Sequence, residues 1–397
     1  MSDSSMPRAI YLDHAATTPV ATEAVSAMTK CLEDPLRFAN PSSIHAAGQA
    51  AASEEKHARE QVANLIGADP ATLLWTSGAT EANNLAILGG ARFRAHRGRH
   101  LVTMRTEHKA VVDPFKALEK NGYEVTWLTP DAGGLLSFDE LRAAIRNDTQ
   151  LVSIMHVNNE TGVIQDVGAI GELCREHDVL YHCDAAQSAG KLPLDVMSAK
   201  IDLLSLTAHK FYGPPGIGAL YIANRDGCGV EPILYGGGQQ RRLRPGTLPV
   251  HLIAGCGAAA GLMANNRSRN LAHVQKLYEV LWDGIKGLPD IFLNGNAEQH
   301  FPGILNVSAA GVEGESLLLA LEPLCVASGS ACNSLSSEPS YVLRALGRSD
   351  QLAQSAIRFS FGHDTALKDI EFARDRYISA VRRLREVAPP AHQDSRA

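Results

Sequence analysis

The chain has 397 residues, more than one hydrophobic core usually serves, so a large domain with a smaller companion is expected. Hydrophobic residues make up 45% and charged residues 20% of the chain, a globular composition that excludes fibrous and disordered proteins. The formal net charge of -6 provides no basic surface, so we expect no direct binding to nucleic acid.

The N-terminal sequence MSDSSMPRAIYLDHAATTP has no basic segment followed by an apolar one, and no run of about 18 apolar residues occurs in the chain. We therefore expect a cytoplasmic protein without a membrane span. Seven cysteines without a C-x-x-C pair argue against a disulfide framework or a zinc ribbon. Cys174, His177, His182 and Cys183 match no common zinc spacing, so the sequence predicts no metal site.

Short apolar runs alternate with segments of helical period through the first 222 residues. Because these runs are almost continuously hydrophobic, they predict an α/β fold in which helices cover both faces of a sheet. Such sheets bind ligands at the carboxyl ends of their strands. The expected strands are 73–76, 100–104, 124–128, 151–155, 179–183, 202–206 and 218–222, with helices at 53–66, 139–146 and 167–177.

The pattern changes after residue 222. A glycine-rich turn at 236–238 and a basic loop precede an Ala/Gly-rich helix at about 250–263, and a second, polar helix is expected to follow it. The region from about 264 to the C-terminus is predicted to be a smaller α+β domain. Its expected elements are strands at 304–307 and 356–360 and a final helix at 369–387.

The first expected strand runs into Ser77-Gly78-Ala79-Thr80-Glu81, which opens a helical pattern. Backbone N–H groups and a threonine hydroxyl at a helix N-terminus are typical of an anion site. A plain capping box at a strand-to-helix turn is the alternative, and this segment alone does not decide between them.

Polar residues follow the next strands in the same way. His108 stands at an expected helix start, where a histidine is more often structural, and the cluster HVNNETG at 156–162 needs either a ligand or a turn. Asp184 ends a buried strand, where a carboxylate is costly unless a cation faces it. A helix cap is the alternative for Asp184.

Lys210 follows the strand at 202–206 and is a candidate for Schiff-base formation. The glycines after it form no G-x-G-x-x-G at a helix start, which argues against nicotinamide binding. Taken together, the strand ends offer a phosphate cup, a ring-stacking histidine, an acid for a pyridine nitrogen and a Schiff-base lysine. This combination predicts pyridoxal 5'-phosphate (PLP) as the cofactor.

Ten motifs between about residues 10 and 387 carry a family resemblance: YLDHAATTP, FANPSS, TSGATEANN, TEHKAVVD, HVNNETG, HCDAAQSAG, SLTAHKFYGPPGIGALY, RPGTLPV, SGSACNS and QSAIRFSFG. Through them the chain resembles the cysteine desulfurases of the iron-sulfur-cluster housekeeping and nitrogen-fixation type, in the class V aminotransferase superfamily. The resemblance implies a fold-type I PLP transferase whose large domain, 16–263, holds a mixed, mostly parallel seven-stranded sheet. Residues 1–15 and 264–397 would form the small domain.

The resemblance also implies a homodimer that takes sulfur from L-cysteine, releases alanine, and passes the sulfur to a protein acceptor such as an iron-sulfur scaffold. Lys210 would form the Schiff base, His108 would stack on the cofactor ring, Asp184 would pair with the pyridine nitrogen, and Gln187 would contact the phenolic oxygen. The implied phosphate ligands are Ala79, Thr80, Thr207 and His209, with Thr247 from the other subunit.

Arg358 matches the arginine that binds the substrate carboxylate, and Asn159 would assist beside the cofactor ring, in contact with both cofactor and substrate. Cys332 matches the persulfide carrier, and the small polar residues around it, at about 327–338, predict a mobile loop. Cys325 lies between Leu324 and Val326 and is expected to be a buried structural thiol.

Three alternatives to this interpretation remain. The chain could be a selenocysteine lyase or another fold-type I PLP enzyme, or a desulfurase dedicated to DNA or transfer-RNA sulfur modification. It could also be a sulfur-carrier or scaffold subunit without activity, although Lys210, Asp184 and His108 argue against this.

Overall fold

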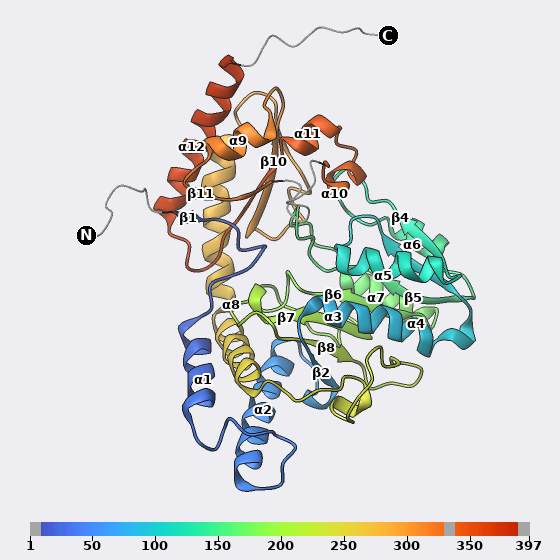
Figure 1. The fold of residues 1–397 in the computed structure, drawn as a ribbon. Coiled ribbons are helices and arrows are strands. Elements are labelled where there is room, and N and C mark those ends of the chain that lie inside the picture. The colour runs from blue at the N-terminus through green and yellow to red at the C-terminus, as the bar shows by residue number, and fades with distance from the viewer. Residues whose placement is uncertain (1–8, 329–337, 388–397) are drawn as a thin grey trace.

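The computed structural model describes residues 9–328 and 338–387 (Figure 1). Its largest sheet has seven strands in the order β2-β8-β7-β6-β5-β3-β4. Strand β8 is antiparallel to both of its neighbours, and the other pairs are parallel. The predicted α/β class and the mixed, mostly parallel seven-stranded sheet are confirmed. The strands are β2 (Leu73–Thr76), β3 (His100–Met104), β4 (Glu124–Leu128), β5 (Thr149–Ser153), β6 (Leu180–Asp184), β7 (Leu203–Thr207) and β8 (Gly218–Ile222).

Successive side chains on a strand point to opposite faces of the sheet. Since apolar side chains lie on both faces here, helices cover both of them. On β3, Leu101 packs into one buried cluster and Val102 into another. The helices up to the end of the sheet are α1 (Thr22–Glu33), α2 (Ala46–Leu65), α3 (Ala79–Asn84), α4 (Gly90–Phe93), α5 (Lys109–Lys120), α6 (Phe138–Ala144) and α7 (Val167–Glu176). A π-helical segment, Leu85–Gly89, joins α3 to α4.

The two helices expected after residue 249 are one helix, α8 (Val250–Ile285), of 36 residues. The prediction of two was wrong because the change from Ala/Gly-rich to polar composition near residue 263 contains no proline, and a single glycine, Gly261, does not end the helix. The first half of α8 packs against α1 and α2, and the helix also packs against α12 (Leu367–Val387). A side chain at Gly257 would place its Cβ 2.6 Å from the Cα of Ala58, which explains the small residues in that half.

A second core lies beside the large sheet and is built mainly from residues after 270. It includes an antiparallel sheet in the order β12-β13-β10-β9. The N-terminal strand β1 (Ile10–Tyr11) joins this region by pairing in parallel with β11. The remaining elements are β9 (Ile291–Leu293), β10 (Ile304–Ala309), α9 (Gly314–Ala320), β11 (Leu324–Cys325), β12 (Ala327–Ser328), α10 (Tyr341–Ala345), α11 (Asp350–Gln354) and β13 (Ile357–Ser360).

The division into domains 16–263 and 1–15 plus 264–397 stays our proposal. The separate core and the β1–β11 pairing support it, although α8 runs unbroken across residue 263. Ala327 and Ser328 pair with β13, so the loop predicted from residue 327 does not include its first two residues. Cys332 lies outside the described residues. Within the described ranges, no helix combines the length and apolar character needed to cross a bilayer.

Candidate functional site

A cavity of about 470 Å³ lies where β2, β6 and β7 end. This is the edge at which open α/β sheets bind ligands, and the volume suits a small cofactor. Thr247 is exposed and does not line the cavity, and Cys332 falls outside the described residues. The structure brings together here the predicted residues Ala79, Thr80, His108, Asn159, Asp184, Gln187, Thr207, His209, Lys210 and Arg358.

Asp184 presents a buried carboxylate at the end of β6. Its Oδ2 accepts a hydrogen bond of 2.7 Å from Asn83 Nδ2, and its Oδ1 accepts one of 2.9 Å from the Ala186 backbone N–H. Both donors are neutral, so they solvate the negative charge without cancelling it. Sequence reasoning missed Asn83, whose position one helical turn after Ala79 was the available signal. The Oδ1 atom of Asn83 is buried and has no hydrogen-bond partner among the described residues.

A main-chain carbonyl connects two of the predicted cofactor residues. The Ala15 carbonyl oxygen accepts hydrogen bonds from Lys210 Nζ and, at 2.8 Å, from Gln187 Nε2. Gln187 Oε1 in turn accepts from Lys191 Nζ at 3.2 Å. Burial, together with the positive charges of Lys210 and Arg358, lowers the pKa of Lys191 to about 7. The network fixes the Gln187 amide with one edge toward Lys191 and the other toward Ala15.

Two histidines in the cavity wall favour the neutral form. His108 caps α5, and its Nδ1 accepts from the Ala110 N–H at 3.1 Å, which assigns the ring proton to Nε2. Burial lowers the pKa of His108, with Asp184 raising it and Lys210 lowering it. Burial also lowers the pKa of His209 to about 4, aided by the nearby lysines 210 and 191. Neutral rings suit stacking and hydrogen bonding better than charge pairing.

The turn from β2 to α3 carries features of both interpretations left open by the sequence. Glu81 Oε2 accepts from the Ser77 N–H at 2.8 Å, as a capping contact would. Thr80 nevertheless lies exposed on the wall of the cavity, which Thr207 at the end of β7 also lines. Gly78 has φ of 153°, a conformation that a side chain disfavours, so glycine is needed at this turn. A hydroxyl and backbone groups are therefore available for an anion.

Arg358 reaches the cavity from β13 in the smaller sheet and is almost fully buried. Its Nη1 donates to the Asn159 carbonyl oxygen at 2.8 Å, and its Nη2 pairs with Asp13 Oδ1 at 2.8 Å. Its Nε has no partner among the described residues. Asp13 and Asn159 thus fix a planar fork suited to a carboxylate, and Asp13 is a contributor that the sequence did not reveal.

These residues fit PLP on their own chemistry. The cofactor needs an amine, a carboxylate for its ring nitrogen, a ring-stacking group and phosphate ligands. Lys210, Asp184, His108 and Thr80 offer these groups around one cavity. The unpartnered Asn83 Oδ1 beside Asp184 is a further buried polar atom that such a ligand or its water would satisfy.

The cysteines differ from expectation at one position. Cys31, Cys174, Cys183 and Cys256 are buried, but Cys325 is exposed, so the prediction that it is a buried thiol was wrong. Strand β11 alternates its side chains, and Leu324 takes the inward position. Over the residues that the structure describes, no three His, Cys, Asp or Glu side chains are placed to hold a metal ion.

Comparison with known proteins gives consistent matches over nearly the whole chain. The family model "Aminotransferase class-V" matches residues 10–372. "Cysteine desulfurase IscS" of Proteus mirabilis is 51% identical over 381 residues, covering 96% of this chain and 94% of that protein. The same enzyme name applies to a Klebsiella pneumoniae relative that is 50% identical with equal coverage.

Solved structures agree with these sequence matches. The structure titled "NIFS-LIKE PROTEIN" superposes with a TM-score of 0.86 at 32% identity, covering 94% of this chain and 99% of that one. "SspA in complex with cysteine" superposes with a TM-score of 0.78 at 37% identity, covering 90% and 100%. With half of its residues identical to named enzymes, and with the matching fold, this chain belongs to the cysteine desulfurases of the class-V aminotransferase family.

Proposed function

We propose that this protein is a PLP-dependent cysteine desulfurase, which removes sulfur from L-cysteine, releases L-alanine and holds the sulfur as a persulfide on Cys332. The observation that carries the proposal is the position of Asp184 at the end of β6 and of Lys210 just after the adjacent parallel strand β7, on one cavity that Arg358 also lines. The relative crystallised with cysteine supports the choice of substrate.

The cavity residues would divide the work as follows. PLP, when bound, supplies an aldehyde and an electron sink for the substrate α-carbon. Asp184, fixed by Asn83, would keep the ring nitrogen protonated, and Lys210 would supply the amine that takes the substrate α-proton. The hydroxyls of Thr80 and Thr207, with His209, would bind the phosphate, and His108 would cover the ring.

Substrate orientation and sulfur transfer fall to other groups. Arg358, held by Asp13 and the Asn159 carbonyl, would bind the cysteine carboxylate. The Cys332 thiolate attacks the substrate sulfur, so an S–S bond forms as the Cβ–S bond breaks. The electron pair stays with Cβ, which takes a proton and becomes the methyl group of alanine.

The test uses the purified protein with PLP and L-cysteine. One alanine should form for each sulfur recovered, and Lys210→Ala should form none and lose the visible absorption of the bound cofactor. Lys200→Ala is the matched control, because Lys200 is partly exposed, pairs with Glu172 and does not line the cavity. Alanine formation by Lys210→Ala equal to that of the control would refute the proposal, and a strong preference for selenocysteine would favour the lyase alternative.

We further propose a homodimer in which Thr247 of each subunit completes the phosphate site of the other. Thr247 is exposed and absent from the cavity of its own chain, as this arrangement requires. A hybrid of Lys210→Ala and Thr247→Ala subunits should regain activity if sites are shared. The protein sulfur acceptor, such as an iron-sulfur scaffold, and the cytoplasmic location stay predictions.

A further inference from the structure

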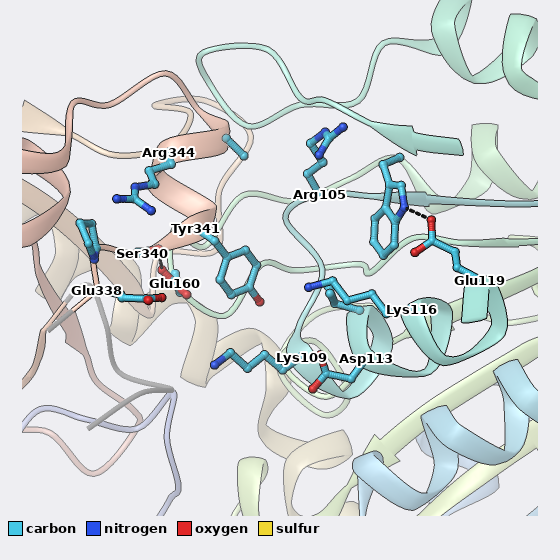
Figure 2. A pocket seen from close by; sticks show the side chains of 14 residues that line it. Arg105, Lys109, Asp113, Lys116, Glu119, Glu160, Glu338, Ser340, Tyr341 and Arg344 are labelled. Carbon is cyan, nitrogen blue, oxygen red and sulfur yellow. Dashed lines mark hydrogen bonds between the residues drawn. The ribbon is translucent and has the colours of Figure 1, made fainter. Parts of the chain in front are cut away.

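A second cavity, of about 730 Å³, lies between α5 and α10, next to the candidate site (Figure 2). Glu160 and Ser340 lie together in its wall, and only 4% of the surface of each is exposed. Neither residue has a part in the proposed chemistry. Glu160 directly follows Asn159, and Ser340 stands eight residues after Cys332 in the chain. This pair therefore connects the candidate site to the chain that leads from the carrier cysteine.

The Ser340 hydroxyl has two roles at once. It donates to Glu160 Oε2 at 2.5 Å and accepts from the Leu343 N–H at 3.2 Å, which caps α10. The hydroxyl has one proton, which it donates to Glu160. A lone pair of the same oxygen is then free to accept the helix N–H. A cap alone would need no buried carboxylate, because water could take the hydroxyl proton.

Glu160 is itself rigidly held. Asn158 Oδ1 accepts from the backbone N–H groups of Glu160 and Thr161, both at 2.9 Å. The Glu160 carbonyl oxygen accepts from Asn306 Nδ2 at 3.0 Å. The turn that carries the Glu160 carboxylate is thus held by hydrogen bonds on both sides, so Ser340 is hydrogen-bonded to a residue with a fixed backbone.

A second contact, at the next residue, supports the same conclusion. The Tyr341 hydroxyl donates to the Glu107 carbonyl oxygen at 2.7 Å, and Glu107 directly precedes His108. Figure 2 shows the Tyr341 ring extending into the cavity toward α5. Residues 340 and 341 are therefore both tied to neighbours of predicted site residues.

We propose that Glu160 is a positioning residue, which through Ser340 anchors the carboxyl end of the Cys332-bearing segment beside the substrate cavity. This inference rests on the proposed function. Eight residues extend to roughly 27 Å at most, so the place of the anchor limits where the thiol can travel. Losing the anchor should slow the attack on substrate sulfur without changing cofactor binding.

The test compares four variants. Ser340→Ala and Glu160→Ala remove the anchor, whereas Glu160→Gln keeps an acceptor for the Ser340 hydroxyl. Ser349→Ala is the matched control, since Ser349 caps α11 through Leu352 N–H at 3.3 Å but touches no part of the candidate site. Three measurements apply to each: cofactor absorption, the rate of persulfide formation on Cys332 after rapid quenching, and hydrogen exchange of residues 338–346.

If the anchor acts as proposed, persulfide should form about tenfold more slowly in Ser340→Ala and Glu160→Ala, because each variant loses one buried hydrogen bond. The cofactor spectrum should be unchanged. Hydrogen exchange of 338–346 should be faster in both. Glu160→Gln should stay within about twofold of the parent, and Ser349→Ala should form persulfide normally.

Equal persulfide rates in Ser340→Ala and Ser349→Ala would overturn the anchor. If Ser340→Ala does not fold, Glu160→Ala against Glu160→Gln makes the same comparison. If the parent protein forms no persulfide, the proposed function fails, and the hydrogen exchange of Ser340→Ala against Ser349→Ala still decides whether the contact restrains residues 338–346.

Discussion

Replacing Glu160 with glutamine should stabilise the folded protein at about pH 8.5 but leave its stability nearly unchanged at about pH 4.5. Burial raises the pKa of Glu160, and the Ser340 hydrogen bond and the charges of Arg358 and Lys109 only partly oppose it, so that the pKa rises from its ordinary 4.5 to about 7. The folded protein therefore binds a proton that the unfolded chain releases between these two values. Wild-type stability falls as the pH rises through this window, and the glutamine variant should not share the loss.

The size of the effect follows from the shift in pKa. Each pKa unit corresponds to about 1.4 kcal/mol, so a rise from 4.5 to about 7 amounts to about 3 kcal/mol above pH 7. Glu160 is buried, so solvent screens little of this energy.

Guanidinium unfolding of both proteins at one protein concentration, at several pH values from about 4.5 to 8.5, measures the difference. Glu338→Gln is the control, because Glu338 lines the same cavity but is exposed. A stability difference between Glu160→Gln and the parent that does not change with pH would refute the reasoning.

Three further changes test the candidate site. Asp184→Ala removes a carboxylate held by two hydrogen bonds and should weaken PLP affinity about ten- to a hundredfold in a spectroscopic titration; unchanged affinity would contradict its role. Arg358→Lys cannot reproduce a planar fork, so the KM for cysteine should rise about tenfold with PLP affinity unchanged, and an unaltered KM would place the carboxylate elsewhere. Cys325→Ser should keep turnover within about twofold, and a large loss would implicate this exposed thiol in sulfur transfer.

The sequence predicted the large sheet well because all of its strands except the edge strand β4 are buried on both faces. The apolar runs of β2, β3 and β8 end sharply at polar or glycine residues, so these strands have the predicted bounds, as does β4. Ligand binding at strand ends then located Asp184 and Lys210 on the same cavity. The place of the candidate site thus followed from the local apolar pattern of the strands and from the tendency of such sheets to bind ligands at their strand ends.

Other features depend on tertiary geometry that leaves no local pattern. The Ala15 carbonyl that joins Lys210 to Gln187 belongs to the main chain and carries no side-chain signal. Asp13 and Arg358 are 345 residues apart in the sequence, and their ion pair depends on the tertiary pairing of the N-terminal segment with β11 and Ser360. Cys325 looked buried from its apolar neighbours, but the two-residue alternation of β11 turns it outward.

The location of the persulfide tests the central claim most directly. The protein is exposed briefly to L-cysteine in the presence of PLP, treated with an alkylating probe and digested, and its seven cysteines are compared by mass spectrometry. The account predicts a persulfide on Cys332, released alanine in equal amount, and neither product in Cys332→Ser, whose cofactor spectrum should still respond to cysteine. A persulfide on Cys325 with normal turnover by Cys332→Ser would contradict it.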